Sequence, residues 1–238
     1  MINKSDLLKM VFMDIETIAA YEHFGEVPEP LKSSFMKSYR HHDNPDYDDL
    51  WKRFAPLKSE CNEIVSVAFG TLKLEDGIYR KRTLKHVSLD DPRMMASVLQ
   101  KLGNTVSSQG GMFAGHNILN FDLPTIARKL IIAGLSIPTS LLMYGVKPWE
   151  VNHKDSMLIW GQGAYGYKAS LESLCHVLGV ETPKAILSGD KVSEHYYGAA
   201  NKKDALADIG EYCMKDIVAS MEVMCRLYGV KPEQMMIE

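Results

Sequence analysis

The chain has 238 residues, of which 46% are hydrophobic, so it holds enough apolar material for one large core. Its net charge of −3 provides no overall positive field, so a nucleic-acid partner would have to be held by local basic patches or bound cations. The four cysteines form no Cys-x-x-Cys pair, and no apolar run reaches the roughly 20 residues of a membrane helix, so we expect a soluble, cytoplasmic protein with free thiols and no membrane contact.

The N-terminal part of the chain is expected to form three antiparallel strands. Apolar runs predict a first strand over 10–15 and a second over 63–74. The sequence EDG at 75–77 is a hairpin signal that leads into a third strand over 78–87. Between the first two strands, residues from about 20 to 60 contain four prolines and the polar run RHHDNPDYDD. We therefore expect an irregular insertion there, with short helices and no core of its own.

The rest of the chain is expected to alternate helices with strands. The predicted elements are a helix over 92–102, a short buried strand over 112–117, helices over 124–134 and 170–178, and a last helix over 203–228. Asp155 is expected to begin a further helix. Together these elements predict a single α/β domain over 1–238, in which a mixed sheet of three antiparallel strands followed by parallel strands is flanked by helices.

The sequence VFMDIET, residues 11–17, places two carboxylates in a stretch that otherwise has the composition of a buried strand. Side chains two apart on a strand leave on the same face, so Asp14 and Glu16 are expected to project together from the end of the first strand. Two adjacent anions are costly to bury unless cations neutralise them, and hard oxygen ligands suit Mg²⁺ or Mn²⁺. On these residues alone, the alternative that both side chains only cap the turn after the strand stays open.

Two further motifs each carry an acidic residue. In GHNILNFDLP, residues 115–124, Asp122 stands between a predicted strand and a helix, where it either caps that helix or faces a site. In EYCMKD, residues 211–216, Tyr212 and Asp216 stand one turn apart on the last helix. An exposed pair at this spacing would be ordinary, but the neighbouring positions are apolar, so the pair is a candidate for a cleft.

Four carboxylates and a tyrosine therefore follow one another along the chain, in the order Asp14, Glu16, Asp122, Tyr212 and Asp216. Over nearly its whole length the chain resembles the DEDD superfamily (DnaQ-like) of 3′-to-5′ exonucleases, in its tyrosine-bearing branch. Within that superfamily its motifs most resemble the proofreading domain of family-B DNA polymerases and the stand-alone predicted exonucleases related to that domain. The branch depends on Tyr212, because the other branch carries a histidine at the position that Glu211 occupies here.

The resemblance implies a ribonuclease H-like fold whose carboxylates converge at the end of the central strands. It also implies hydrolysis of the terminal phosphodiester with two divalent metal ions, Mg²⁺ or Mn²⁺, as cofactors. The implied substrate is the 3′ end of single-stranded or frayed DNA or RNA, with DNA favoured, and the products are nucleoside monophosphates. Because two cations can stabilise both the attacking and the leaving oxygen of a phosphoryl displacement, this chemistry suits an acidic cluster.

The resemblance also implies a role for individual residues. Asp14 would bridge both ions, Glu16 and Asp216 would complete the shell of the first, and Asp122 would hold the second. Tyr212 would orient the attacking water, since its reference pKa of about 10 makes it a poor base at neutral pH. The substrate contacts implied within the same motifs are Thr17, Asn117 and Phe121.

Two alternatives stay open on the sequence. DIETI superficially resembles the Asp-x-Asp-x-Thr nucleophile motif of haloacid-dehalogenase-like phosphatases, but Glu16 and Ile18 stand where that motif needs aspartate and threonine. The other alternative is a non-catalytic nucleic-acid-binding module of the same fold. All five expected positions are filled, which argues against a decayed site.

Overall fold

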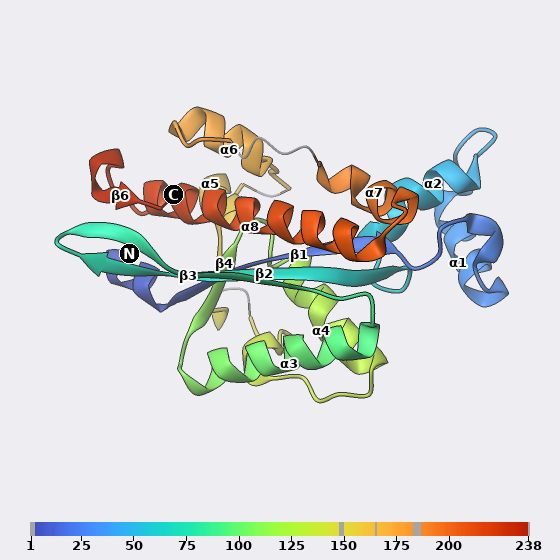
Figure 1. Cartoon of the computed structure of the whole chain (residues 1–238), viewed down its shortest axis with the longest axis horizontal. Helices are drawn as coiled ribbons and strands as arrows, with labels where there is room; N and C mark the ends of the chain where they lie inside the picture. Colours follow the sequence, from blue (N-terminus) through green and yellow to red (C-terminus); the bar gives the residue numbers. More distant parts are fainter. Residues whose placement is uncertain (1–2, 148–149, 165, 183–186, 238) are drawn as a thin grey trace.

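The computed structural model describes residues 3–147, 150–164, 166–182 and 187–237, and within them a six-stranded sheet lies between two groups of helices (Figure 1). The sheet has the order β5-β4-β1-β2-β3-β6, and its strands are β1 (Met10–Ala19), β2 (Asn62–Glu75), β3 (Ile78–Ser88), β4 (Met112–Gly115), β5 (Lys154–Asp155) and β6 (Met235–Met236). The α-helices are α1 (Glu29–Tyr39), α2 (Tyr47–Phe54), α3 (Pro92–Ser108), α4 (Asp122–Ile132), α5 (Ser156–Gly161), α6 (Leu171–Leu178), α7 (Val192–Gly198) and α8 (Lys202–Leu227).

The pairing of the strands confirms the predicted mixed sheet. β1, β2 and β3 pair antiparallel, while β4 runs parallel to β1, β5 parallel to β4 and β6 parallel to β3. The turn between β2 and β3 consists of Asp76 and Gly77, whose φ angles of 51° and 78° are both left-handed. A two-residue turn with both residues at positive φ matches the twist of the strands, which explains why EDG predicted this hairpin correctly.

The two faces of the sheet are covered by different helices: α8 crosses one face, and α3 and α4 lie on the other (Figure 1). Alternate residues of β1 follow this division, since Phe12 packs in the cluster with α8, whereas Met13 and Ile15 pack in the cluster with α3 and α4. Asp14 and Glu16 have the parity of Phe12 and therefore point to the α8 side.

β1 is longer than the sequence predicted. Its pairing with β2 continues as far as Ala19 opposite Asn62, with an irregularity between Glu16 and Thr17. Asp14 and Glu16 therefore lie inside the strand, and the expectation that they project from its end is wrong. The alternative that they cap a turn after the strand is also wrong, because the next three residues are still extended and paired with β2. Two acidic residues lowered the local preference for a strand, but pairing with β2 overrides that preference.

Helix α3 also exceeds its predicted length and continues to Ser108 through Gly103, a weak helix former. A Cβ atom at Gly103 would lie 2.8 Å from Pro138 Cγ, so the glycine allows the loop after α4 to pack closely on this helix. Tertiary packing therefore stabilises a turn that local propensity disfavours. None of the described helices combines the length and the apolar character required to cross a membrane.

The segment between β1 and β2 is more ordered than predicted. It contains helices α1 and α2, which lie beyond one end of the sheet (Figure 1), and it buries an aromatic cluster around Phe24, Phe35 and Trp51. The expectation of an irregular insertion without a core of its own is therefore wrong. The short helices expected there are present, and Pro28 and Pro30 occupy the N-cap and the first turn of α1, where proline costs no hydrogen bond.

Candidate active site

Four acidic residues that are far apart in the sequence come together beside β1. Asp14 and Glu16 project from β1 itself, Asp216 comes from α8, and Asp122 is the first residue of α4. The four carboxylates repel one another: after burial, the charges of Asp122, Glu16 and Asp216 are the further causes that raise the pKa of Asp14. The fold therefore assembles the acidic cluster that the three motifs predicted.

Asp122 reaches the cluster because the sheet is incomplete at this point. The pairing of β4 with β1 ends at Ala114 opposite Phe12, so the backbone N–H of Ile15 has no strand partner on that side. It donates to Asp122 Oδ1 at 3.0 Å. The N-cap of α4 is Phe121, without a side-chain cap, so the alternative that Asp122 only caps the helix is wrong.

The four carboxylates of the cluster are buried close together, and each has a raised pKa. Burial is the main cause that raises the pKa of Asp14 and of Glu16 well above the usual range, and the neighbouring carboxylates raise both further. Burial also raises the pKa of Asp122 to about 7 and that of Asp216 to about 6. Among the described residues, no lysine, arginine or histidine forms an ion pair with any of the four. Buried carboxylates are costly unless cations neutralise them, and their oxygens are the ligands that divalent cations such as Mg²⁺ prefer.

Tyr212 lies one helical turn before Asp216, and the two groups interact, since each shifts the pKa of the other. Both side chains line a cavity of about 260 Å³, together with Leu171, Glu172, Thr182, Leu187 and Ser188. The pair therefore faces a hollow between α8, α6 and the segment before α7. Burial, followed by the charges of Asp216 and Glu16, raises the pKa of the Tyr212 hydroxyl, so it stays protonated at neutral pH.

Cys213 is a member of the cluster that the sequence did not reveal. Its Sγ donates to Asp14 Oδ2 at 3.3 Å, and the ligand atoms of Asp14, Glu16 and Cys213 all lie within 4.8 Å of one another. Burial, followed by the charge of Asp14, raises the pKa of the Cys213 thiol well above its usual range, so the sulfur is a hydrogen-bond donor. In the sequence Cys213 belongs to the apolar stripe of the last helix, and its only signal was its position between Tyr212 and Asp216.

The three residues that the resemblance assigned to the substrate have different surroundings. Thr17 is buried and its hydroxyl donates to Pro56 O at 2.8 Å. Asn117 is partly exposed, adopts a left-handed conformation with φ 59°, and accepts from Asn120 Nδ2 at 3.2 Å. Phe121 is partly buried and packs against the apolar cluster below the sheet. Asn117 and Phe121 are partly exposed, whereas the hydroxyl of Thr17 is engaged within the protein.

Asp155 fixes the loop that precedes Asp122. It is the N-cap of α5, which confirms that it begins a helix, and it accepts from Met157 N at 3.0 Å. The same buried carboxylate also accepts from Asn117 N at 2.9 Å and from Leu119 N at 3.1 Å. Nothing in the sequence connects position 155 with this loop. The connection arises because β5 pairs with the end of β4.

Asp155→Ala is expected to lower the free energy of unfolding by about 3 kcal/mol, because three backbone N–H groups lose a charged acceptor in a buried place. Urea denaturation measures this change. The matched control is Asp91→Ala, which removes an exposed N-cap with two such bonds on α3 and should cost about 1 kcal/mol. Equal losses in the two variants would show that Asp155 only caps its helix.

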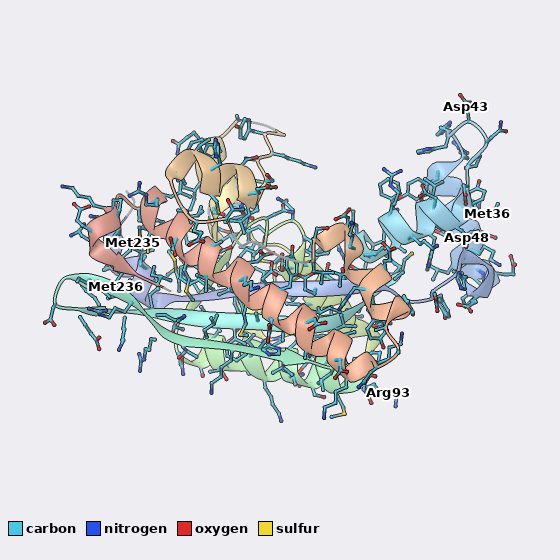
Figure 2. All side chains as sticks on the ribbon, turned by 45° about the horizontal axis from the view of Figure 1, so that its top comes forward. Met36, Asp43, Asp48, Arg93, Met235 and Met236 are labelled. Carbon is cyan, nitrogen blue, oxygen red and sulfur yellow. The ribbon has the colours of Figure 1, made fainter. Side chains whose placement is uncertain are left out.

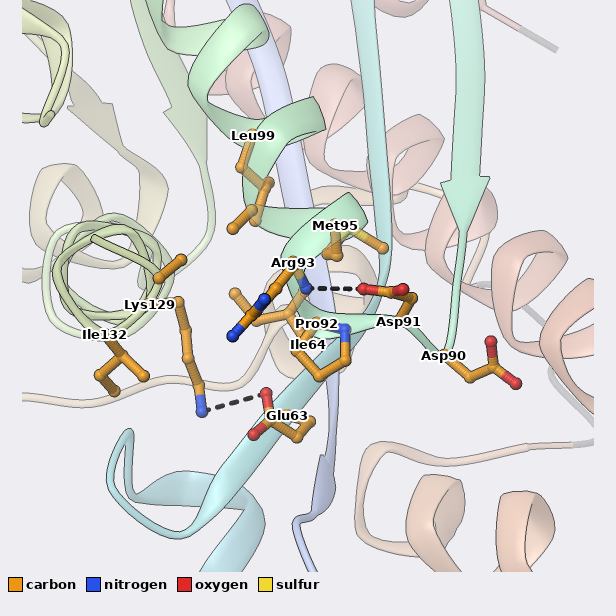
Figure 3. Close-up of a pocket in the computed structure, with 12 residues that line it drawn as sticks. Glu63, Ile64, Asp90, Asp91, Pro92, Arg93, Met95, Leu99, Lys129 and Ile132 are labelled. Carbon is orange, nitrogen blue, oxygen red and sulfur yellow. Dashed lines mark hydrogen bonds and ion pairs between the residues drawn. The ribbon is translucent and has the colours of Figure 1, made fainter. Parts of the chain in front are cut away.

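A larger cavity of about 620 Å³ lies on the other side of the sheet, between α3, α4 and the start of β2 (Figure 3). Three of its charged groups are engaged with one another or with the backbone: Lys129 pairs with Glu63 at 3.3 Å, and Asp91 caps α3. The floor consists of side chains from the apolar cluster below the sheet, such as Met95 and Leu99. None of the four carboxylates lines this cavity.

Comparison with known proteins agrees with this geometry. A protein-family model described as "Predicted 3'-5' exonuclease related to the exonuclease domain of PolB" matches residues 53–233. Among solved structures, the chain is similar to the family B DNA polymerase from the hyperthermophilic archaeon Pyrobaculum calidifontis, with a TM-score of 0.53 and 14% sequence identity. That match covers 92% of this chain and 24% of the polymerase chain. No curated protein sequence matches. The structural likeness and the mixed sheet confirm the ribonuclease H-like fold.

Proposed function

The chain belongs to the family of predicted 3′-5′ exonucleases related to the exonuclease domain of PolB, and we propose that it is an active, metal-dependent member of that family. We propose that its substrates are 3′ ends of single-stranded or frayed nucleic acid, DNA in preference to RNA, and that it releases nucleoside monophosphates. The observation that carries the proposal is the convergence of four carboxylates, all with raised pKa, at one place beside β1.

The acidic cluster is proposed to hold two divalent cations, Mg²⁺ or Mn²⁺, through Asp14, Glu16, Asp122 and Asp216. Bound there, the cations would neutralise the carboxylates and polarise the phosphodiester and the attacking water. The charges of all three other carboxylates raise the pKa of Asp14, which supports a central position for Asp14 as the ligand shared by both ions. Asp216 is the strongest charged neighbour of Glu16, which supports a role for these two as ligands of one ion.

The chain's other side chains are proposed to orient the reacting groups. Tyr212 keeps its proton at neutral pH, so it can position a water molecule or a phosphate oxygen by hydrogen bonding but cannot act as the base. Cys213 donates to Asp14 and so restrains the rotation of the carboxylate that the cluster shares. Asn117 and Phe121, which are partly exposed and belong to the same motif as Asp122, are proposed to contact the terminal nucleotide.

The phosphatase alternative finds no support in the surroundings of β1. Ile18 stands where the phosphatase motif needs threonine, and it is buried in an apolar cluster with Val65 and Ile209. Asp14 is surrounded by other carboxylates, whose charge disfavours the approach of an anionic phosphate to an aspartate nucleophile in the absence of several cations.

Incubation of 5′-end-labelled single-stranded DNA and RNA with the protein and Mg²⁺ or Mn²⁺ tests the proposal. We expect a ladder of products that shortens from the 3′ end, and we expect Asp216→Ala to abolish it. The control is Asp208→Ala, which removes an exposed carboxylate two turns earlier on the same helix and should leave the ladder unchanged. A wild-type protein that binds the strands but yields no ladder with either metal would favour the non-catalytic binding module.

A further inference from the structure

A layered stack of cations and aromatic rings lies on the segment between β1 and β2. The rings of Tyr39 and Phe54 stack with centroids 5.1 Å apart, Lys58 Nζ lies 5.3 Å from the Tyr39 ring, and the Arg53 guanidinium lies 5.3 Å from the Phe54 ring. At the end of α1, Arg40 follows Tyr39 directly in the chain. These residues, Tyr39, Arg40, Arg53, Phe54 and Lys58, are called the Tyr39 surface below.

Three acidic groups of the same segment, Glu26, Asp46 and Asp48, are engaged in its internal structure. Asp46 accepts from the backbone of α2, Asp48 accepts from Phe24 N at 2.8 Å, and Glu26 accepts from His23 N. Figure 2 shows Asp43 at the turn between the two helices and Asp48 on α2. Among the described residues, Arg40 and Lys58 form no ion pair, and the contact of Arg53 with Asp49 is an exposed pair of little strength. The Tyr39 surface therefore keeps a net positive charge, although the segment as a whole does not.

The segment is attached to the elements that carry the acidic cluster. Thr17, the residue after Glu16, donates to Pro56 O at 2.8 Å, and Lys58 follows two residues later. Ser59 donates to Thr125 Oγ1 at 3.3 Å and accepts from Arg128 Nη1 at 3.2 Å, and both partners lie on α4, which Asp122 begins. Lys58, a member of the Tyr39 surface, is therefore about two residues, at most ~7 Å of chain, from Pro56, which contacts β1 through Thr17.

From this arrangement we propose that the Tyr39 surface binds the phosphate backbone of the substrate strand a few nucleotides before its 3′ end. The inference rests on the proposed function and names a part of the chain that holds the substrate. The cations are the groups available to the ligand, because the two rings face each other and Lys58 and Arg53 cover them. Contacts of this kind recognise phosphates without reading the base sequence. The surface would hold a long strand while leaving its last nucleotide free for the acidic cluster.

The triple variant Arg40→Gln, Arg53→Gln, Lys58→Gln tests this inference. Binding of a labelled single strand of about 20 nucleotides is measured by fluorescence anisotropy in EDTA, where no metal-dependent hydrolysis interferes. Each lost phosphate contact on a single strand should lower the slope of log affinity against log salt by about 0.7, hence by about 2 in total. At about 0.1 M salt this corresponds to roughly a hundredfold weaker binding. Hydrolysis of a dinucleotide, which is too short to reach the surface, should be unchanged.

The matched control removes the same charge elsewhere, through Arg82→Gln and Lys85→Gln on β3 and Lys101→Gln on α3, and should change the slope little. Unchanged binding in the Tyr39-surface variant, or an equal loss in both triple variants, would overturn the inference. If the wild-type protein failed to hydrolyse even the dinucleotide, the proposed function would be wrong, while the comparison of the two variants in EDTA would still decide the role of the surface.

Discussion

Asp14→Asn is expected to lower the rate of hydrolysis by about 10³-fold or more and, at the same time, to raise the thermal stability of the metal-free protein. The loss of rate follows from removing the carboxylate proposed to be shared by both cations, whose contribution to a phosphoryl transition state is several kcal/mol. The gain in stability follows from removing a charge that burial and three neighbouring carboxylates disfavour. Asparagine keeps the shape and can still accept from Cys213.

The two effects are measured separately, the first as the single-turnover rate with Mg²⁺ or Mn²⁺ and the second as the melting temperature in EDTA above pH 7. We expect the stability to rise by about 1 to 2 kcal/mol, because the uncompensated repulsion is relieved. Asp208→Asn, on the exposed side of α8, should change neither quantity by much. A lower melting temperature for Asp14→Asn in EDTA would contradict the expectation that these buried carboxylates destabilise the metal-free protein.

The metal-free protein is expected to lose stability as the pH rises from about 4 to 7. In the folded protein the pKa of Asp216 is about 6 and that of Asp122 about 7, both above the reference value of 3.8. Between the reference value and these raised values the folded protein binds more protons than the unfolded chain, so the stabilising contribution is complete below about pH 4 and is lost as the pH passes 6 and then 7. The total change from these groups is on the order of several kcal/mol.

Divalent cations are expected to reverse this dependence. The carboxylates must be deprotonated to bind metal, so Mg²⁺ or Mn²⁺ should stabilise the protein increasingly as the pH rises. Thermal unfolding between pH 5 and 8, with EDTA and with each metal, measures both slopes. In the double variant Asp122→Asn, Asp216→Asn both slopes should become shallower, and the part that remains is the contribution of Asp14 and Glu16, whose pKa values are also raised. If this variant kept the slopes of the wild-type protein, other groups would be responsible for them.

The local parts of the fold were readable from the sequence because their determinants are contiguous in the chain. Asp76 and Gly77 specify a two-residue turn, and the apolar stripe of the last helix repeats at helical spacing up to Gly229. The acidic residues could be identified for a related reason: a carboxylate among strand or helix residues that are otherwise buried stands out against its own neighbours. The family resemblance then related three such places to one another.

The conformation of the segment between β1 and β2 could not be read in this way. Its prolines and charges indicate short helices without a core of their own, yet Phe24, Phe35 and Trp51 bury one another once α1 and α2 form. Burial of large aromatic side chains outweighs the local signals, because each contributes on the order of 2 kcal/mol. The sequence contains these residues, but only the folded chain shows that they meet.

The sequence by itself determined the mixed α/β class, the β2–β3 hairpin, the long last helix and the identity of the acidic residues. Tertiary structure alone decided how they are held, through the contacts of Asp122 with Ile15, of Asp155 with Asn117 and of Cys213 with Asp14. These pairs are separated by 107, 38 and 199 residues. Local propensity carries no information about such pairs, because their hydrogen bonds depend on which strands end next to one another and which helix covers them.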